Sequence, residues 1–344
     1  MKKIVKQVCG IDVAQKELVV CFGTLNEDFS LNLSSPKTFA NTVKGCTMLL
    51  SWAKKQAAKD VPLRFAMEAT GVYHEQLAYF LDDHEQEVSI ILPNKISNYF
   101  RTLEVKTVND DTASQAIARF ALERHGLKCW KRPNPIYRQL RNLGRERDQI
   151  VHERTIAKNQ LHAELAQAFA ETSTIKRLKA RIKLLDKQEA EVKAEIAKLA
   201  KSDPEVHQAV TLLKTIKGFG DLTAIIILAE TDGFALIKCR RQLASYAGFD
   251  VKDKLSGTSV KGKARISKRG NKYLRKAMYY PAMTAARHDE KFKQVYARVV
   301  ARNGFKMKAA VAVQRRLLEM AYIVFKNKVP YDPEYINSKE LQPA

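Results

Sequence analysis

The sequence has few of the features that mark membrane, secreted or zinc-binding proteins. No apolar run approaches the roughly 18 residues of a membrane-spanning helix. The stretch MKKIVKQVCGID has a charged head but lacks the apolar core and small-residue cleavage site of a signal peptide. The five cysteines are scattered and never form a Cys-x-x-Cys pair, so neither a disulfide framework nor a zinc site is indicated. We therefore expect a cytoplasmic protein without a membrane partner.

The sequence also lacks the usual motifs of nucleotide-hydrolysing enzymes and of enzymes with a catalytic histidine dyad. No Walker-type glycine loop is present, and the seven histidines are scattered, which gives a histidine dyad little support. Acidic residues are scarce: 37 Asp and Glu stand against 60 Lys and Arg, giving a formal net charge of +23. This charge favours a polyanionic partner, nucleic acid first and an acidic membrane surface second.

The first part of the chain, residues 1–130, predicts an α/β domain. Residues 3–36 contain three short runs rich in Val, Ile, Leu, Phe and Cys, which predict hairpin-linked strands. A helical pattern over 38–57 follows, and the strands LRFAMEAT and VSIILP then alternate with helices. This order is typical of an RNase H-like (RuvC-like) fold, although other α/β folds share it.

Residues 131–203 predict a helical spacer. Pro133 and Pro135 break the chain, and the stretch after them is polar and almost free of Gly and Pro. Apolar residues at three- and four-residue spacing predict a coiled-coil seam, with Glu189 at one seam position. The seam residues are Ile175, Leu178, Ile182, Leu185, Val192, Ile196 and Leu199. The pattern fits either an antiparallel hairpin within one chain or a coiled coil across a dimer.

Residues 204–344 predict a mostly helical C-terminal domain. Two apolar helices flank a Gly218-Phe219-Gly220 turn. It is either a plain turn or a helix-hairpin-helix unit in which backbone N–H groups at Gly218 and Gly220 bind a phosphate. We expect the second helix to continue as far as Gly248. Two more helices, KYLRKAMYYPAMTAARH and AVAVQRRLLEMAYIVFKN, are expected after it.

Four acidic residues in three segments stand out in the α/β domain. Asp12 in CGIDVA and Glu68 in FAMEAT interrupt runs suited to buried strands, where an ionised carboxylate is costly without a cation or donor. Asp110 and Asp111 begin a predicted helix, where acidic residues also serve as ordinary N-terminal charges. Each alone could be a solvent-facing residue. Together they could hold two Mg²⁺ ions at a phosphodiester, because hard oxygen ligands suit Mg²⁺.

A basic segment that contains two serines occupies residues 253–280. Ser256 and Ser259 lie beside glycines and could be turn formers, or one of them could be a nucleophile; the residues alone do not decide. The cations around them are expected to bind the nucleic-acid backbone, with little reading of sequence. These cations are Lys254, Lys261, Lys263, Arg265, Lys268, Arg269 and Lys272.

Three segments resemble one known family: GIDVAQKELVV, MEATGVYHEQLAYFL and YAGFDVKDKLSGTSVKGKARISKRGNKYLRKAMYYPAM. They are similar to DEDD-type transposases of the insertion sequence one-ten family, which also resemble Piv-type DNA invertases. TIKGFGDLTA and VPYDPEY extend the likeness nearly end to end. The resemblance implies a RuvC-like domain, a coiled-coil region and a C-terminal domain with a nucleophilic serine. It also implies dimers that assemble into tetramers on DNA, in some members with a bridge RNA as guide.

The family motifs, carried over position by position, imply roles for individual residues. The implied metal carboxylates and nucleophile are Asp12, Glu68, Asp110 and Ser256. The family's fourth acid falls at Ala113, which is a departure from the pattern. Asp111 or, through a water molecule, Ser114 could substitute for it.

The resemblance therefore implies a transposase or site-specific recombinase that acts on donor and target duplex DNA. Strands would be cut and rejoined through a covalent 5′-phosphoserine intermediate, with the assistance of Mg²⁺ and under the guidance of a bridge RNA. Three alternatives stay open: a metal-only RuvC-like nuclease or junction resolvase, a Piv-type invertase without RNA, and a basic scaffold without enzymatic activity.

Overall fold

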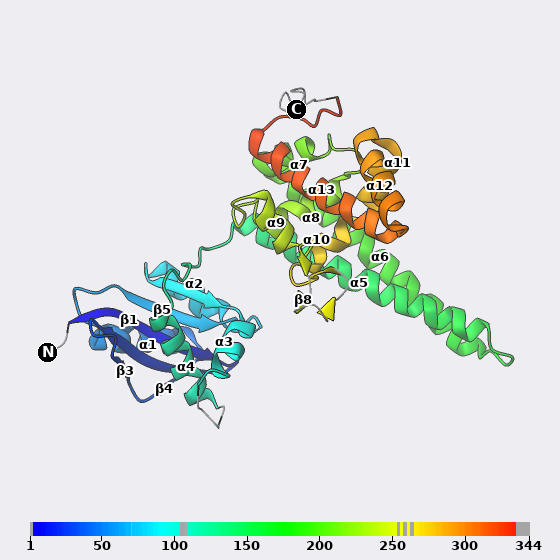
Figure 1. Cartoon of the computed structure of the whole chain (residues 1–344). Helices are drawn as coiled ribbons and strands as arrows, with labels where there is room; N and C mark the ends of the chain where they lie inside the picture. The colour runs from blue at the N-terminus through cyan, green and yellow to red at the C-terminus, as the bar shows by residue number, and fades with distance from the viewer. Residues whose placement is uncertain are drawn as a thin grey trace, which may run out of the picture. The chain divides into compact units, whose positions relative to one another are not determined.

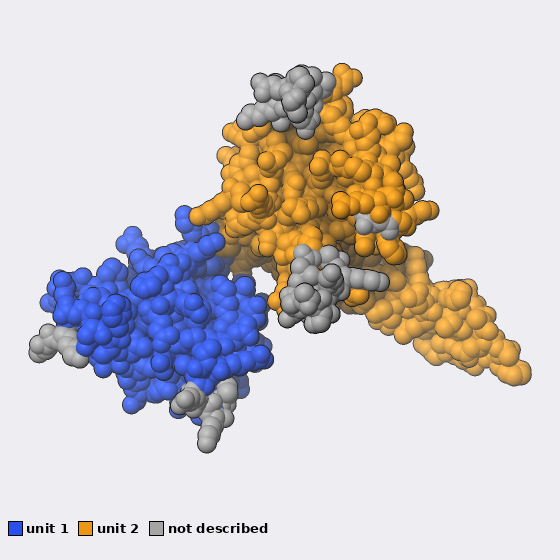
Figure 2. Space-filling model, viewed as in Figure 1, with its two compact units in different colours: residues 1–132 blue, residues 133–344 orange. Residues whose placement is uncertain are grey.

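The computed structural model describes residues 3–69, 71–103, 107, 109–252, 255–256, 260–261 and 265–334, without the side chains of residues 255, 256, 260, 261 and 303. The chain divides into two compact units, Met1–Arg132 and Pro133–Ala344 (Figure 2). The described helices and strands give a mixed α/β first unit and a mostly helical second unit.

The first unit is built on one mixed sheet with strand order β3-β2-β1-β5-β6, and β4 also pairs with β2 (Figure 1). β1, β2 and β3 run antiparallel, whereas β1, β5 and β6 run parallel. The strands are β1 (Ile4–Val13), β2 (Glu17–Asn26), β3 (Leu31–Leu33), β4 (Lys37–Ala40), β5 (Leu63–Glu68) and β6 (Glu87–Ile91). The predicted order of three antiparallel strands followed by alternating helices and strands is thus confirmed.

Helices cover both faces of this sheet: α1 (Val43–Gln56), α2 (Glu75–Asp83), α3 (Pro93–Phe100) and α4 (Asp110–Glu123). Side chains of a strand alternate between faces. Cys9 and Ile11 of β1 accordingly pack in a core with α1 and α2, whereas Val8 packs in a core with α3 and α4. Burial on both faces explains why β1 reads as an almost continuous apolar run.

The helix expected over residues 38–57 begins later than predicted. Lys37–Ala40 forms an edge strand, β4, paired with β2, and Phe39 is buried in the core. The helix begins at Val43 because Thr42 caps it, accepting a hydrogen bond from the backbone N–H of Gly45. The helical periodicity does not reveal that the backbone groups of Lys37–Ala40 pair with β2.

The second unit begins with two long helices, α5 (Pro135–Leu165) and α6 (Thr172–Ser202), which pack together as an antiparallel hairpin (Figure 1). The predicted seam lies between them: Leu185, Val192 and Ile196 are buried. Of the two arrangements that fit the pattern, the hairpin within one chain is present. A role for this region in dimers stays a prediction.

Glu189 is a buried carboxylate in the hairpin seam, with 4% of its surface exposed. It forms ion pairs with Arg147 (2.8 Å), Lys193 (2.8 Å) and Arg154. Burial alone would raise the pKa of Glu189. The hydrogen bond from Lys193 and the charges of the two arginines outweigh burial and lower the pKa to about 2.

We expect Glu189→Gln to lower the free energy of unfolding by roughly 3 kcal/mol at pH 7. Because the folded-state pKa is depressed, the ionised carboxylate stabilises the fold above the unfolded-state value of about 4.3, and this stabilisation is lost as the pH falls toward 2. Urea unfolding at pH 7 and at lower pH should therefore show the difference between wild type and variant shrinking below pH ~4. Glu195→Gln, at an exposed position of α6, is the matched control. A variant as stable as wild type at pH 7 would contradict this expectation.

The rest of the second unit is a helical cluster with two short strand pairs. Its helices are α7 (Pro204–Leu213), α8 (Asp221–Thr231), α9 (Arg240–Tyr246), α10 (Lys272–Ala277), α11 (Tyr279–His288), α12 (Glu290–Asn303) and α13 (Lys306–Asn327). One apolar core joins them, with contributions from Leu228, Leu274 and Leu317. No helix in the described ranges is both long enough and apolar enough to cross a membrane.

One expectation for these helices was wrong, and another was right in part. The helix expected to reach Gly248 ends at Thr231, because the next residue, Asp232, adopts a left-handed conformation, and helix resumes only as the short α9. Of the two helices expected near the C-terminus, the second is confirmed as α13, whereas the first is divided at Met278 into α10 and α11. Between them lies α12, which was not predicted. Asp289 accepts hydrogen bonds from the first backbone N–H groups of α12, and Gly304, with φ of 70°, ends that helix.

Candidate functional site

Asp12 and Glu68 stand next to each other at the C-terminal ends of two neighbouring strands. Parallel β1 and β5 pair with Ile11 opposite Met67, so the residue after each is a carboxylate. The alternation of side chains places both carboxylates on the face that α3 and α4 cover. Both residues are half-buried. The register of two strands thus brings together side chains 56 positions apart in the printed sequence.

The helix α4 reaches this sheet end because Gly10 has no side chain. A Cβ atom at Gly10 would lie 2.2 Å from the backbone nitrogen of Ala118 and 2.5 Å from the backbone oxygen of Ser114. The helix begins at Asp110, with a capping box formed by Asn109 and Thr112. Close contact between α4 and β1 therefore brings the start of the helix, with Asp110, toward Asp12.

The three carboxylates form a chain of like charges. Burial, and after it the charge of Asp110, raises the pKa of Asp12, which a backbone hydrogen bond at Val13 partly offsets. Burial and the charge of Asp12 raise the pKa of Glu68. A bound cation would lower the pKa of both carboxyl groups, since it favours their ionised forms.

The donors fit a hard divalent cation in type and in charge, because all three are carboxylate oxygens. Among the residues that the structure describes, no three His, Cys, Asp or Glu side chains converge as the ligands of one ion. The carboxylates would have to move closer together to bind one ion. Their roles as metal ligands stay predictions.

The candidates for a fourth ligand differ in their environment. Asp111 is exposed in the first turn of α4, whereas Ala113 is half-buried. Ser114 is buried, and its hydroxyl donates to the backbone oxygen of Asp111 at 2.8 Å. That bond occupies the Ser114 hydroxyl, so of the two suggested substitutes Asp111 has the more accessible side chain.

Asn41 is a site-supporting residue that the sequence analysis missed. Its Nδ2 donates to the backbone oxygens of Ala14 (2.9 Å) and Tyr73 (3.2 Å). These two residues follow the strands that carry Asp12 and Glu68. Asn41 therefore ties together the two loops at the carboxylate end of the sheet. No sequence signal could have found it, since its partners lie 27 and 32 positions away.

The basic segment of the second unit is partly a strand structure rather than only a loop. β7 (Val251–Lys252) pairs with β10 (Arg265–Ile266), and β8 (Leu255–Ser256) pairs with β9 (Val260–Lys261). Ser256 is paired through its backbone opposite Val260. Lys254, Ser259 and Lys263 lie outside the described residues, as do the side chains of Ser256 and Lys261.

The remaining predicted nucleic-acid contacts are exposed where the structure describes them. Arg265, Lys268, Arg269 and Lys272 are all exposed. At the helix-hairpin-helix-like turn, Gly220 is exposed at the start of α8, whereas the α-carbon of Gly218 faces Pro281: a Cβ there would lie 2.6 Å from the Pro281 oxygen. The close packing requires glycine at position 218. Phosphate contact at this turn stays a prediction.

A buried polar network anchors the base of the basic segment. Glu230 of α8, 3% exposed, accepts two hydrogen bonds from Arg145 (2.9 Å each) and one from Asn271 Nδ2 (2.6 Å). Asn271 also caps α10, accepting from the backbone N–H groups of Tyr273 and Leu274. The sequence analysis missed this network, although a lone carboxylate at the end of the apolar run AIIILAE was an available signal.

We expect Glu230→Gln to lower the free energy of unfolding by about 2 kcal/mol, because charge-assisted hydrogen bonds to a buried group are lost. The change should also raise the rate of limited trypsin cleavage between residues 252 and 276, since one amide oxygen cannot replace both carboxylate oxygens in the network that holds Asn271. Peptide mapping by mass spectrometry measures that rate. Glu290→Gln is the control, because that carboxylate is 67% exposed in its pair with Lys293. If trypsin cleaved Glu230→Gln no faster than Glu290→Gln and the wild type, Glu230 would not anchor the basic segment.

Comparison with known proteins gives matches in both units. A DEDD-type IS110 transposase domain matches residues 9–170, and a domain described as "Transposase IS116/IS110/IS902 family" matches residues 210–297. The pilin gene-inverting protein of Moraxella bovis is 27% identical over 332 residues, or 95% of this chain and 98% of that protein. An insertion element IS110 protein of 43.6 kDa from Streptomyces coelicolor is 26% identical over 40% of this chain and 34% of its own length.

Among solved structures, Thermus thermophilus RuvC in complex with a Holliday junction substrate covers 33% of this chain and 90% of its own, at 11% identity and a TM-score of 0.25.

Proposed function

Because the chain belongs to the IS110-type transposase family and is therefore a DNA transposase or recombinase, we propose that it cuts and rejoins DNA strands through a covalent bond to Ser256. The first unit would act as an RNase H-like, RuvC-like domain with carboxylates Asp12, Glu68 and Asp110. The second unit would supply the serine and the basic surface that binds the DNA backbone.

The observation that carries this proposal is the run of coupled carboxylates in the first unit. Strand register places Asp12 beside Glu68, and the close approach of α4 at Gly10 brings Asp110 to Asp12. These three residues would hold Mg²⁺, in one or two ions, with Asp111 as a further ligand. When bound, the ion supplies positive charge for the scissile phosphate and lowers the pKa of an attacking hydroxyl.

The proposed covalent step exchanges one ester bond for another. The Ser256 hydroxyl oxygen attacks phosphorus, its bond to phosphorus forms, and the bond from phosphorus to the 3′ oxygen breaks. The serine loses its proton and the 3′ oxygen gains one, which leaves a 5′-phosphoserine and a free 3′-hydroxyl. Attack by a different 3′-hydroxyl reverses the step and joins the new strands, so no ATP is consumed.

The partners follow from this chemistry and from the family resemblance. Donor and target duplex DNA are the substrates, and exposed cations such as Lys268 and Arg269 would bind their phosphates. We propose homodimers that assemble into tetramers, with a bridge RNA as guide. The likeness to the pilin gene-inverting protein over 98% of its length favours a second candidate, site-specific DNA inversion. In this candidate the reaction would need no RNA.

The test is to incubate the wild-type protein with labelled element-junction DNA, RNA transcribed from the flanking sequence, and Mg²⁺. Denaturing electrophoresis then separates free strands from protein-linked strands, and mass spectrometry of the digested adduct identifies the linked residue. A phosphodiester link on Ser256 is the expected result. Strand cleavage without any adduct would instead identify a metal-only nuclease.

The same reaction separates the guided and unguided candidates. If the purified protein is treated with ribonuclease and the transcript is left out, a bridge-RNA-guided enzyme should form no adduct. An invertase that works without RNA should form the adduct at an undiminished rate. DNA binding with neither cleavage nor adduct, under every condition, would leave only the scaffold.

A further inference from the structure

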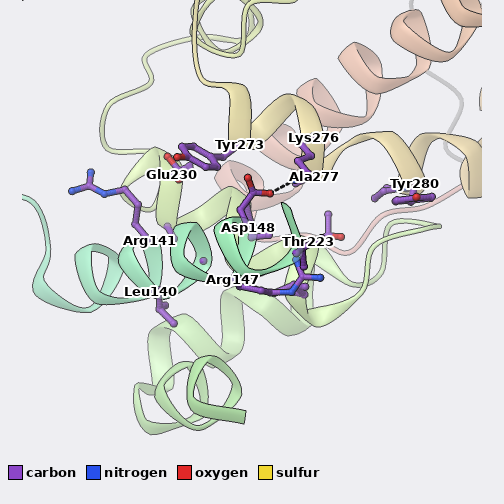
Figure 3. A pocket seen from close by; sticks show the side chains of 16 residues that line it. Leu140, Arg141, Arg147, Asp148, Thr223, Glu230, Tyr273, Lys276, Ala277 and Tyr280 are labelled. Atoms are coloured by element: carbon purple, nitrogen blue, oxygen red, sulfur yellow. Dashed lines mark hydrogen bonds and ion pairs between the residues drawn. The ribbon is translucent and has the colours of Figure 1, made fainter. Parts of the chain in front are cut away.

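A cavity of about 230 Å³ lies within the second unit between α5, α8 and the α10–α11 segment (Figure 3). Its walls are mostly apolar and include Leu140, Ile226 and Ala277. Engineered protein cavities of about 150 Å³ accept a benzene ring. The space is therefore large enough for a flat aromatic group.

Gly144 lines this cavity from the middle of the long helix α5. Glycine is the poorest residue for a helix interior apart from proline, so its presence needs a reason. Packing gives none: a Cβ atom at this position would have only one neighbour within 4 Å, the Ile226 side chain at 4.0 Å. The helix thus accepts an unfavourable residue at a point where any side chain would enter the cavity.

The cavity opens onto a polar groove in which basic side chains outnumber acidic ones. Asp148, Tyr273 and Lys276 line both spaces, and the groove adds Arg145, Lys272 and Glu146. Asp148 and Lys276 form an ion pair, drawn as the dashed line in Figure 3. An aromatic or apolar space beside cationic side chains is the arrangement that binds a base and its phosphate in single-stranded nucleic acid.

A tyrosine ring and a hydroxyl group also line the cavity. Tyr280, 78% exposed, offers a ring at the cavity, and Thr223 offers a hydroxyl. The Thr223 hydroxyl can pair with the ring-nitrogen and carbonyl acceptors that bases present.

We propose that this cavity binds one unstacked nucleobase of the nucleic-acid substrate, with the adjoining phosphate on Lys272 and Lys276. The inference rests on the proposed function, since it assumes a nucleic-acid substrate. It adds a base-binding site in the second unit whose lining includes neither Ser256 nor the proposed metal carboxylates. The site takes up a base that has left its stack, so it acts on single-stranded or distorted regions.

The experiment compares the affinity of the full chain for two short single strands of equal length, one with bases and one abasic. Gly144→Leu fills the cavity, and we expect it to reduce the preference for the base-bearing strand about ten-fold, the usual worth of one stacked base. Affinity for the abasic strand, and its dependence on salt, should stay unchanged because the phosphate contacts remain. Asn142→Leu, at an exposed position on the same helix, is the matched control.

Gly144→Ala keeps the test decisive if the leucine variant fails to fold. This change should raise the melting temperature by about 2–4 °C, as alanine favours helix, and should still weaken the base preference. A residue with a purely structural role would not move stability and binding in opposite directions.

Three results would overturn the inference. In the first, both Gly144 variants fold and keep the full base preference. In the second, filling the cavity changes the oligomeric mass by light scattering but not the base preference, which identifies the cavity as a contact between copies of the chain. In the third, the wild type binds neither strand and forms no adduct, in which case the proposed function fails as well.

Discussion

The Asp12→Asn protein is expected to cleave DNA about a thousand-fold more slowly than wild type and yet, without divalent metal, to melt at a higher temperature. Cleavage slows because a bound metal stabilises the transition state at the phosphodiester by several kcal/mol, and each 1.36 kcal/mol is a factor of ten in rate. The melting temperature rises because burial and the charge of Asp110 raise the pKa of Asp12, which means that the folded protein disfavours the ionised carboxylate.

The pH dependence of the stability difference between the Asp12→Asn protein and the wild type checks the sign of this effect. A carboxylate with a raised folded-state pKa stabilises the fold below its unfolded value of about 3.9, and this contribution is lost as the pH rises through the folded-state value. The stabilisation by Asn should therefore be present at neutral pH and vanish in acid. Thermal melts with EDTA measure this stabilisation. Melts with Mg²⁺ or Mn²⁺ should show a metal-dependent rise in melting temperature for the wild type but not for the Asp12→Asn protein.

Asp60→Asn is the matched control for Asp12→Asn, since Asp60 is an exposed carboxylate in the same unit. It should leave cleavage and the metal-dependent shift intact. Full cleavage by the Asp12→Asn protein would reject the metal role of this carboxylate. Loss of cleavage together with a lower melting temperature in EDTA would point instead to a structural role.

The Ser256→Ala protein should form no covalent adduct with DNA, whereas Ser259→Ala should keep it. Removing the hydroxyl oxygen removes the atom that would bond to phosphorus, so the expected effect is complete loss rather than slowing. The backbone of Ser256 pairs with Val260 in a two-residue strand, and alanine can make the same backbone hydrogen bonds. Denaturing electrophoresis of labelled DNA detects the adduct. A filter-binding measurement of affinity checks that each variant still binds DNA.

The pair of serine variants distinguishes the possible outcomes of this experiment. An adduct that persists in Ser256→Ala and disappears in Ser259→Ala would transfer the nucleophile to Ser259. Cleavage at the wild-type rate in both variants, with no adduct in any protein, would leave the chemistry to the carboxylates alone. Loss of DNA binding in Ser256→Ala would show that this hydroxyl stabilises the β8–β9 strand pair or binds the DNA and does not act as the nucleophile.

Local patterns predicted much of the fold. Alternating and continuous apolar runs gave the strands around Asp12 and Glu68, because burial on a sheet face repeats every two residues. Three- and four-residue spacing placed the seam of the long hairpin, and Asp110 was placed at a helix start, as found. The errors lie where tertiary contacts overrode local pattern. Lys37–Ala40 pairs with β2, and the helix expected to reach Gly248 stops at Thr231.

The sequence by itself determined the chemistry that is available: two carboxylates in buried strands, acids at a helix start, serines among cations, and motifs that identify the family. Only the tertiary structure decided which groups meet. Strand register sets Asp12 beside Glu68, Asn41 links their loops, and Glu230 holds Arg145 to Asn271. These contacts join residues 27 to 85 positions apart. Their geometry depends on strand register and helix packing, which arise from the whole fold and not from any local stretch.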